Sequence, residues 1–161
     1  FKPSKSQKRL MRRNSDLRVD RVQAVATLEQ FGLFVSYQHS RHGDSDMARM
    51  SLADYTAMTQ EGRCNTGILE FRTQDGLLLG AMLFDRLDDG YSAVYSFFDP
   101  GESHRSLGTY MILWLIDEAY GQELPYMYLG FWIDGCSNMS YKSRFKPLER
   151  ITPDGWERME D

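Results

Sequence analysis

Residues 91–120 read YSAVYSFFDPGESHRSLGTYMILWLIDEAY, and the order of elements in this stretch determines the architecture. The first part, Tyr91–Phe98, is an apolar, β-prone run that predicts a buried strand. The last part, Arg105–Tyr120, is apolar on most sides, which predicts a largely buried helix. A further apolar run, Tyr126–Ile133, predicts another buried strand. Because a strand–helix–strand unit is a crossover, we expect Tyr126–Ile133 to lie parallel to Tyr91–Phe98.

Two more apolar, β-prone runs lie upstream, at Gly67–Thr73 and Leu77–Asp85. The sequence QDG (residues 74–76) separates them from each other, and DDG (residues 88–90) separates the second from Tyr91–Phe98. Asp-Gly between two such runs is a strong hairpin signal. The three runs are therefore predicted to form an antiparallel meander.

Helical signals dominate the first sixty residues. Ser4 or Ser6 is placed to cap a helix over Gln7–Arg13, and Ser51 to cap one that ends near Thr59. Between them, apolar residues at helical spacing predict a helix over Val22–Tyr37, with a start near Thr27 as the alternative. We expect a loop over residues 39–46, a short helix over Asn138–Arg144, and irregular structure over residues 146–161. This order of elements predicts one α+β domain over residues 1–161, a mixed sheet flanked by helices.

Composition limits the class of protein. The 161 residues are 42% hydrophobic and 26% charged, which is typical of a globular domain. No apolar run reaches the roughly 18 residues that cross a bilayer. The two cysteines, Cys64 and Cys136, lie outside any C-x-x-C, so we expect no disulfide scaffold, no metal site and a reducing, cytoplasmic compartment. Because the chain begins with Phe1, we expect it to be a piece of a longer protein.

Charge is distributed unevenly along the chain. Residues 1–21 carry eight basic and two acidic side chains, a net +6, whereas the whole chain carries −4. A basic N-terminal arm on an acidic body indicates an anionic partner. A solvated terminus with no partner is the alternative.

The order of elements resembles the N-acetyltransferase-type (GNAT) fold, in which the N-terminus of the crossover helix points at the donor's phosphates. The sequence RSLGTY at residues 105–110 loosely matches that fold's R-x-x-G-x-G/A loop, with Tyr110 in place of the final Gly or Ala. Exposed amides at a helix N-terminus bind anions. On its own this match is weak, because Arg and Gly are common at helix starts.

Three longer strings carry a more specific resemblance, to the bacterial aminoacyl-tRNA–protein transferases. They are FKPSKSQKR with RRN (residues 1–9 and 12–14), YSFFDP with RSLGT (95–100 and 105–109), and YLGFWI with GC, M, YK and FKPLE (128–133, 135–136, 139, 141–142 and 145–149). The resemblance implies a catalytic C-terminal portion with a GNAT-like fold. The cysteine-bearing N-terminal region of that family is absent from this chain, so no metal site belonging to it can be located here.

The function implied is transfer of an aminoacyl group from aminoacyl-tRNA to the α-amine of proteins that begin with Asp or Glu, which marks them for degradation. Trp132 and Gly135 favour leucine as the transferred residue, and no cofactor is implied. An arginyl-tRNA–protein transferase is the first alternative. An acyl-CoA-dependent N-acyltransferase and a non-catalytic N-terminus-binding module are the others.

Three groups of residues are candidates for this chemistry. Guanidinium and other cationic groups grip a carboxylate, so the predicted acceptor-binding residues are Arg9, Arg12, Arg13, Arg41, His42 and Lys142, with tRNA phosphate contact as the alternative. The predicted tRNA-binding residues are Arg105, Ser106, Leu107, Gly108 and Thr109, with ordinary helix capping as the alternative. The predicted proton-handling residues are Asp99, Tyr95 and Tyr128, where a turn former and two core tyrosines are the alternatives.

Overall fold

The computed structural model describes residues 1–43, 45–62, 65–133, 135–136 and 139–159. Cys64 and Asn138 lie outside these ranges. Five strands form one sheet in the order β1-β2-β3-β4-β5. Strands β1 to β4 run antiparallel, and β5 pairs with β4 in parallel, as the crossover predicted. Their bounds are Arg18–Gln23 (β1), Asn65–Arg72 (β2), Leu78–Arg86 (β3), Gly90–Phe98 (β4) and Tyr126–Tyr128 (β5).

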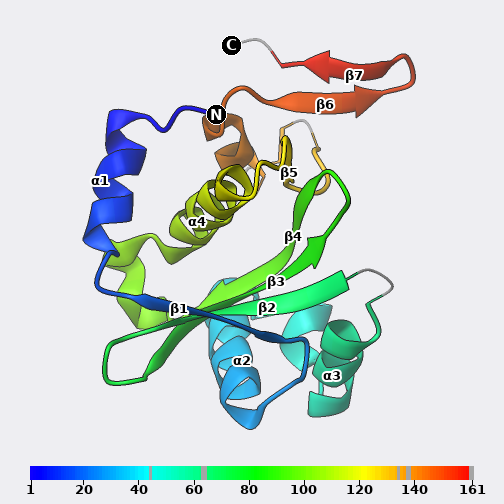
Figure 1. Cartoon of the computed structure of the whole chain (residues 1–161). Helices are drawn as coiled ribbons and strands as arrows, with labels where there is room; N and C mark the ends of the chain where they lie inside the picture. Colours follow the sequence, from blue (N-terminus) through cyan, green and yellow to red (C-terminus); the bar gives the residue numbers. More distant parts are fainter. Residues whose placement is uncertain (44, 63–64, 134, 137–138, 160–161) are drawn as a thin grey trace.

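Helices cover both faces of the sheet (Figure 1). Helices α1 (Lys5–Arg13) and α4 (Leu107–Gly121) lie on one face, and α2 (Leu28–His42) and α3 (Leu52–Gln60) lie on the other. Three 3-10 helices connect these elements: η1 (Asp46–Arg49), η2 (Pro100–Arg105) and η3 (Ser140–Arg144). A separate hairpin of β6 (Glu149–Thr152) and β7 (Gly155–Arg158) follows.

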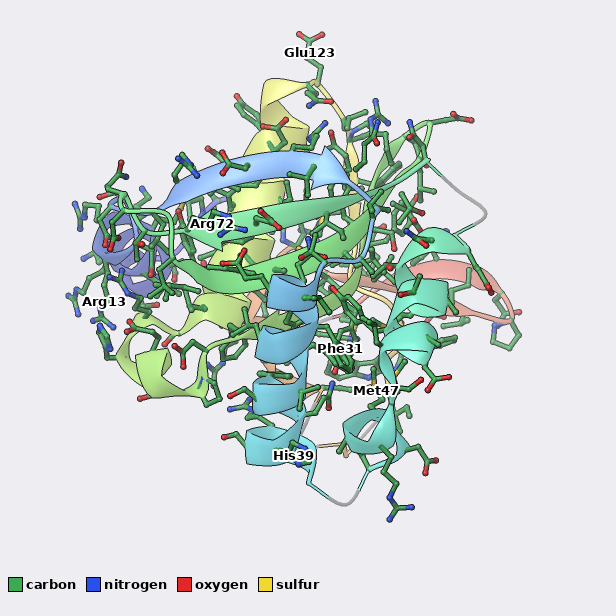
Figure 2. The ribbon with its side chains drawn as sticks, turned by 90° about the horizontal axis from the view of Figure 1, so that it is seen from below. Arg13, Phe31, His39, Met47, Arg72 and Glu123 are labelled. Atoms are coloured by element: carbon green, nitrogen blue, oxygen red, sulfur yellow. The ribbon has the colours of Figure 1, made fainter. Side chains whose placement is uncertain are left out.

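Each face of the sheet has its own apolar core. The α4 face buries Leu107, Met111 and Leu115 against Leu69 and Phe71 of β2. The opposite face buries a second cluster, made by Phe34, Tyr37, Tyr55, Ile68, Ala81, Leu83 and Phe97. Figure 2 shows Phe31 and Met47 in the space between α2 and its neighbouring helices, where both pack on this second cluster. Because the central strands are covered on both sides, they read as continuous apolar runs.

Local capping signals were predicted well. Ser4, Thr27 and Ser51 each begin a helix with a reciprocal capping box, and the partner of Ser51 is Asp54. The meander over β2, β3 and β4 is confirmed.

Other predictions were wrong in their extent. Val22 belongs to β1 rather than to a helix, and α2 continues through residues 39–42, which were predicted as loop. Strand β5 ends at Tyr128, since Gly130 turns the backbone with φ +76°. Helix α4 begins after Arg105, and the segment 146–161 contains the β6–β7 hairpin rather than irregular structure alone.

Candidate functional site

Strand β4 has an open edge near its C-terminal end. The β4–β5 ladder runs only from the Gly90–Tyr126 pair to the Ser92–Tyr128 pair, while β4 continues to Phe98. The register with β3 also shifts here, because Leu83 faces Tyr95 and Phe84 faces Ala93, which leaves Val94 as an extra residue. Bulges of this kind re-aim side chains and end strand pairing. Among the described residues, the second half of β4 therefore lacks pairing with β5 on this side.

The N-terminus of α4 is shaped by a left-handed turn at Ser106, which has φ 49° and ψ 48°. Ser106 gives the helix no side-chain cap, and the Thr109 amide bonds back to the Ser106 carbonyl at 3.1 Å. Leu107 is fully buried in the core. A Cβ on Gly108 would lie 3.0 Å from the Phe98 ring, so glycine lets the helix start pack directly on the end of β4. The first amides of α4 are thus placed to bind an anion.

Arg105 is paired within the chain. Its guanidinium donates to both Asp16 carboxylate oxygens at 2.9 Å and to Glu102 at 2.8 Å. These contacts raise the pKa of Arg105, and the Arg105 hydrogen bond lowers the pKa of Asp16. The side chain therefore braces the loop before α4, and its predicted contact with tRNA stays a prediction.

The three arginines of α1 lie in different surroundings. Arg13 donates to the His104 carbonyl at 2.6 Å, whereas Arg9 and Arg12 lie exposed on the same helix. Figure 2 shows Arg13 at one side of the molecule, well away from His39 near the end of α2. Helix α1 thus borders the N-terminus of α4. Acceptor binding by these three residues stays a prediction.

Arg41 comes close to the helix start from the opposite face. Its guanidinium lies 5.9 Å from the centroid of the Phe98 ring, and Tyr37 packs on the same ring at 4.9 Å. Because Phe98 also lies against Gly108, Arg41 and the N-terminus of α4 both neighbour the Phe98 ring. The side chain of His42 lies outside the described part of the structure.

Tyr95 forms a polar pair with Gln38 that the sequence did not single out. The Gln38 amide nitrogen donates to the Tyr95 hydroxyl at 2.6 Å, and burial raises the pKa of Tyr95. Gln38 is fully buried, and its amide oxygen has no hydrogen-bond partner among the described residues. The Tyr95 phenol oxygen is therefore the acceptor in this pair. A glutamine within the apolar stripe of the 28–42 helix was the signal available in the sequence.

Asp99 and Tyr128 are not brought together. Asp99 accepts from the Gly101 amide at 2.8 Å and so caps the turn that begins η2. Tyr128 donates to Asp89 at 2.9 Å and packs beside Trp156, near the start of β4 and away from Phe98. The turn-forming alternative for Asp99 has a direct structural basis. The catalytic roles of both residues stay predictions.

Lys142 is buried, at 8% exposure, and its ammonium donates to the Phe131 carbonyl. Burial lowers its pKa, and this effect is partly offset by Cys136. The side chain thus ties η3 to the segment after β5. Its predicted contact with an acceptor carboxylate stays a prediction.

The family described as "Arginine-tRNA-protein transferase, C terminus" matches residues 29–152 of the chain. This range contains the α4 start, the open β4 edge and Arg41. The chain belongs to this transferase family.

Curated relatives in this transferase family include two named aspartate/glutamate leucyltransferase. The chain is 50% identical over 158 residues to that of Paramagnetospirillum magneticum and 48% identical over 156 residues to that of Parvibaculum lavamentivorans. The matches cover 98% and 97% of the chain but 65% of each relative. The chain therefore spans about two thirds of the length of these transferases. The family resemblance in the sequence motifs is confirmed.

Solved structures with low sequence identity show the fold. L-PGS from Bacillus licheniformis aligns with a TM-score of 0.65 at 11% identity, over 96% of this chain and 52% of that one. A ribosomal-protein-alanine N-acetyltransferase from Brucella melitensis aligns with a TM-score of 0.56 at 12% identity, over 85% and 93%. The predicted GNAT-like α+β fold is confirmed. None of the described helices combines the length and apolarity needed to cross a membrane.

Proposed function

We propose that the protein containing this chain transfers leucine from Leu-tRNA to the α-amine of proteins that begin with Asp or Glu. We place the reaction in the cytoplasm, with protein marking for degradation as its output. The observation that carries the proposal is the uncapped N-terminus of α4 beside the open edge of β4, in a chain 50% identical to an aspartate/glutamate leucyltransferase. The family is described by arginine transfer, so Arg-tRNA is the second candidate donor.

The reaction depends more on the positioning of the two substrates than on reactive side chains of the enzyme. An aminoacyl-tRNA is an activated ester, and an α-amine with a pKa near 7.7–8.0 is partly unprotonated at neutral pH. The amine attacks the ester carbonyl, a C–N bond forms, the C–O bond breaks, and the ribose hydroxyl leaves with a proton. Such a transfer proceeds without a cofactor, and the enzyme gains rate by holding both substrates and stabilising the oxyanion.

The geometry supports an assignment of these tasks. The first α4 amides would hold an anionic group of the tRNA 3′ end. Exposed Arg9 and Arg12, on the same helix as the Arg13 that contacts the loop before α4, would bind backbone phosphates. Arg41, beside the Phe98 ring, would bind the acceptor carboxylate. The Tyr95 phenol, held by Gln38, would donate a hydrogen bond or a proton near the open β4 edge.

The test is a transfer assay with the full protein, labelled Leu-tRNA or Arg-tRNA, and peptides that differ only in a first residue of Asp, Glu, Lys or Ala. We expect label from Leu-tRNA on the Asp and Glu peptides alone. Transfer only from Arg-tRNA would show that the donor is Arg-tRNA rather than Leu-tRNA and would leave the proposed mechanism unchanged. Transfer from neither, or competition by coenzyme A, would refute the proposal. Arg41→Ala should raise the KM of the acidic peptides, while Arg49→Ala, on η1, serves as the control.

A further inference from the structure

Three residues at the junction of α1 and β1 grip the loop that leads into α4. Arg13 donates to the carbonyl of His104 at 2.6 Å, and Asn14 donates to the carbonyl of Arg105 at 3.0 Å. The two carboxylate oxygens of Asp16 each accept one N–H, from Nη1 and Nη2 of Arg105, at 2.9 Å. Two successive carbonyls and one guanidinium are thus held by three residues within a span of four. We name Arg13, Asn14 and Asp16 the junction clamp.

The loop they hold contains a strained residue. Ser106 has φ 49° and ψ 48°, a left-handed conformation that is unfavourable for any residue with a Cβ. Such conformations persist where the surroundings fix them. Ser106 is flanked on its N-terminal side by the two gripped residues and on its C-terminal side by buried Leu107. The clamp and the core together therefore hold the turn that sets the direction of the first α4 amides.

Asn14 links the α1–β1 junction to the loop from a buried position. The residue is fully buried, and its amide nitrogen donates to Leu10 as well as to Arg105. Its amide oxygen is buried, and the part of the chain that the structure describes offers it no hydrogen-bond partner. An apolar residue here would remove this oxygen but would leave the Leu10 and Arg105 carbonyls without the Asn14 side-chain donor. An apolar residue can supply neither hydrogen bond, and the one to Arg105 is the bond that joins the junction to the loop before α4.

We propose that Arg13, Asn14 and Asp16 are positioning residues for the donor. They hold Ser106 in its left-handed turn and so aim the α4 amides at the anionic end of the aminoacyl-tRNA, and they join basic helix α1 to that site as one unit. The donor in this statement rests on the proposed function. Arg13 and Arg105 thereby act through the loop rather than on the acceptor or the tRNA directly.

The first experiment compares Asp16→Ala with Asp20→Ala in the full protein. Both variants remove one carboxylate that is ion-paired to an arginine at 2.9 Å, and Asp20, paired with Arg18, lies on β1 away from the loop. Asp16→Ala should raise the KM for Leu-tRNA about tenfold and leave the KM of the Asp peptide unchanged. Asp20→Ala should change neither. Equal effects of the two variants would overturn the proposal.

The second experiment tests the strained turn. Glycine adopts positive φ freely, so Ser106→Gly in the Asp16→Ala background should recover most of the lost Leu-tRNA affinity. No recovery would show that Asp16 acts in another way.

Amide hydrogen exchange tests the clamp without using activity. Exchange over residues 106–110 should accelerate in Asp16→Ala and stay unchanged in Asp20→Ala, with β3 equally protected in both as the check on global folding. Unchanged exchange over residues 106–110 would refute the clamp. A wild-type protein that transfers no amino acid would refute the proposed function, and this exchange comparison would still decide the clamp.

Discussion

Gly90 allows β4 and β5 to meet, and replacing it with alanine should separate them. Gly90 is the first residue of β4 and pairs with Tyr126 at the base of the open edge. A Cβ at this position would lie 2.3 Å from the Tyr126 carbonyl oxygen and 2.9 Å from the carbonyl carbon. Both are backbone atoms, so no side-chain rotation can relieve the contact.

The size of the effect follows from these distances. A relaxed carbon–oxygen contact is about 3.3 Å, so the backbone of β5 must move by about 1 Å. Overpacking of a buried site costs about 1–3 kcal/mol, and a backbone contact belongs at the upper end. We therefore expect Gly90→Ala to lower the free energy of unfolding by about 3 kcal/mol. For a chain of this size the Tm should fall by roughly 6–12 °C.

Gly32→Ala is the matched control. Apart from its chain neighbours and the backbone of its own helix, no atom of the described residues lies within 4 Å of a Cβ built on Gly32, which is an exposed position inside α2. The same chemical change there should stabilise the protein by about 0.5–1 kcal/mol, because alanine favours the helix. Urea unfolding of both variants measures the two effects, which should have opposite signs. A Gly90→Ala protein as stable as wild type would refute the argument that glycine is needed at the β4–β5 contact.

Three further predictions concern buried polar groups. Arg72→Met leaves the Glu70 carboxylate buried without its ion pair and should lower the free energy of unfolding in urea by about 3–5 kcal/mol. A decrease below about 1 kcal/mol would contradict this. Tyr95→Phe removes the acceptor of the Gln38 amide and should cost about 1–3 kcal/mol, most of which Gln38→Leu in the same variant should restore; additive losses would argue against the pair. Burial lowers the pKa of Lys142 below 10.5, so the unfolded chain binds more protons than the folded chain at high pH, and the free energy of unfolding should rise as pH rises toward 10.5. Lys142→Met should flatten that rise. An unchanged slope in pH-dependent unfolding would contradict this prediction.

Local chemistry made much of the fold predictable from the sequence. The capping boxes at Ser4, Thr27 and Ser51 act within four residues, so the local sequence alone determines where each of these helices begins. The Asp-Gly turns act over a similar range. Strand β1 was missed because it is an edge strand in which Arg18, Asp20 and Arg21 interrupt the apolar pattern. Its strand conformation depends on pairing with β2, which no local signal reports.

The β6–β7 hairpin was missed for a related reason. Its strands are short and largely exposed, so their composition is that of a loop. One anchor is distant in sequence, since Trp156 packs against Tyr128. The early end of β5 has a local cause, at Gly130, but the apolar run that continues past it gave the opposite signal. In both cases a short-range pattern competed with a backbone or tertiary feature and misled the prediction.

The role of Arg105 could not be predicted from the local sequence either. An arginine and a glycine at the start of a helix indicate an anion-binding site. The same pattern occurs whether the arginine binds the ligand or braces the loop, because both roles need a guanidinium at the same position. The deciding observation is the carboxylate of Asp16 at 2.9 Å, which comes from 89 residues away. Three of the five N–H groups of Arg105 already donate to the carboxylates of Asp16 and Glu102, and the negative charge of these carboxylates disfavours a phosphate beside them. The partners of Arg105 therefore favour the bracing role. The backbone amides of α4 can bind an anion without breaking any ion pair, so donor binding is better assigned to them than to the arginine that marks them in the sequence.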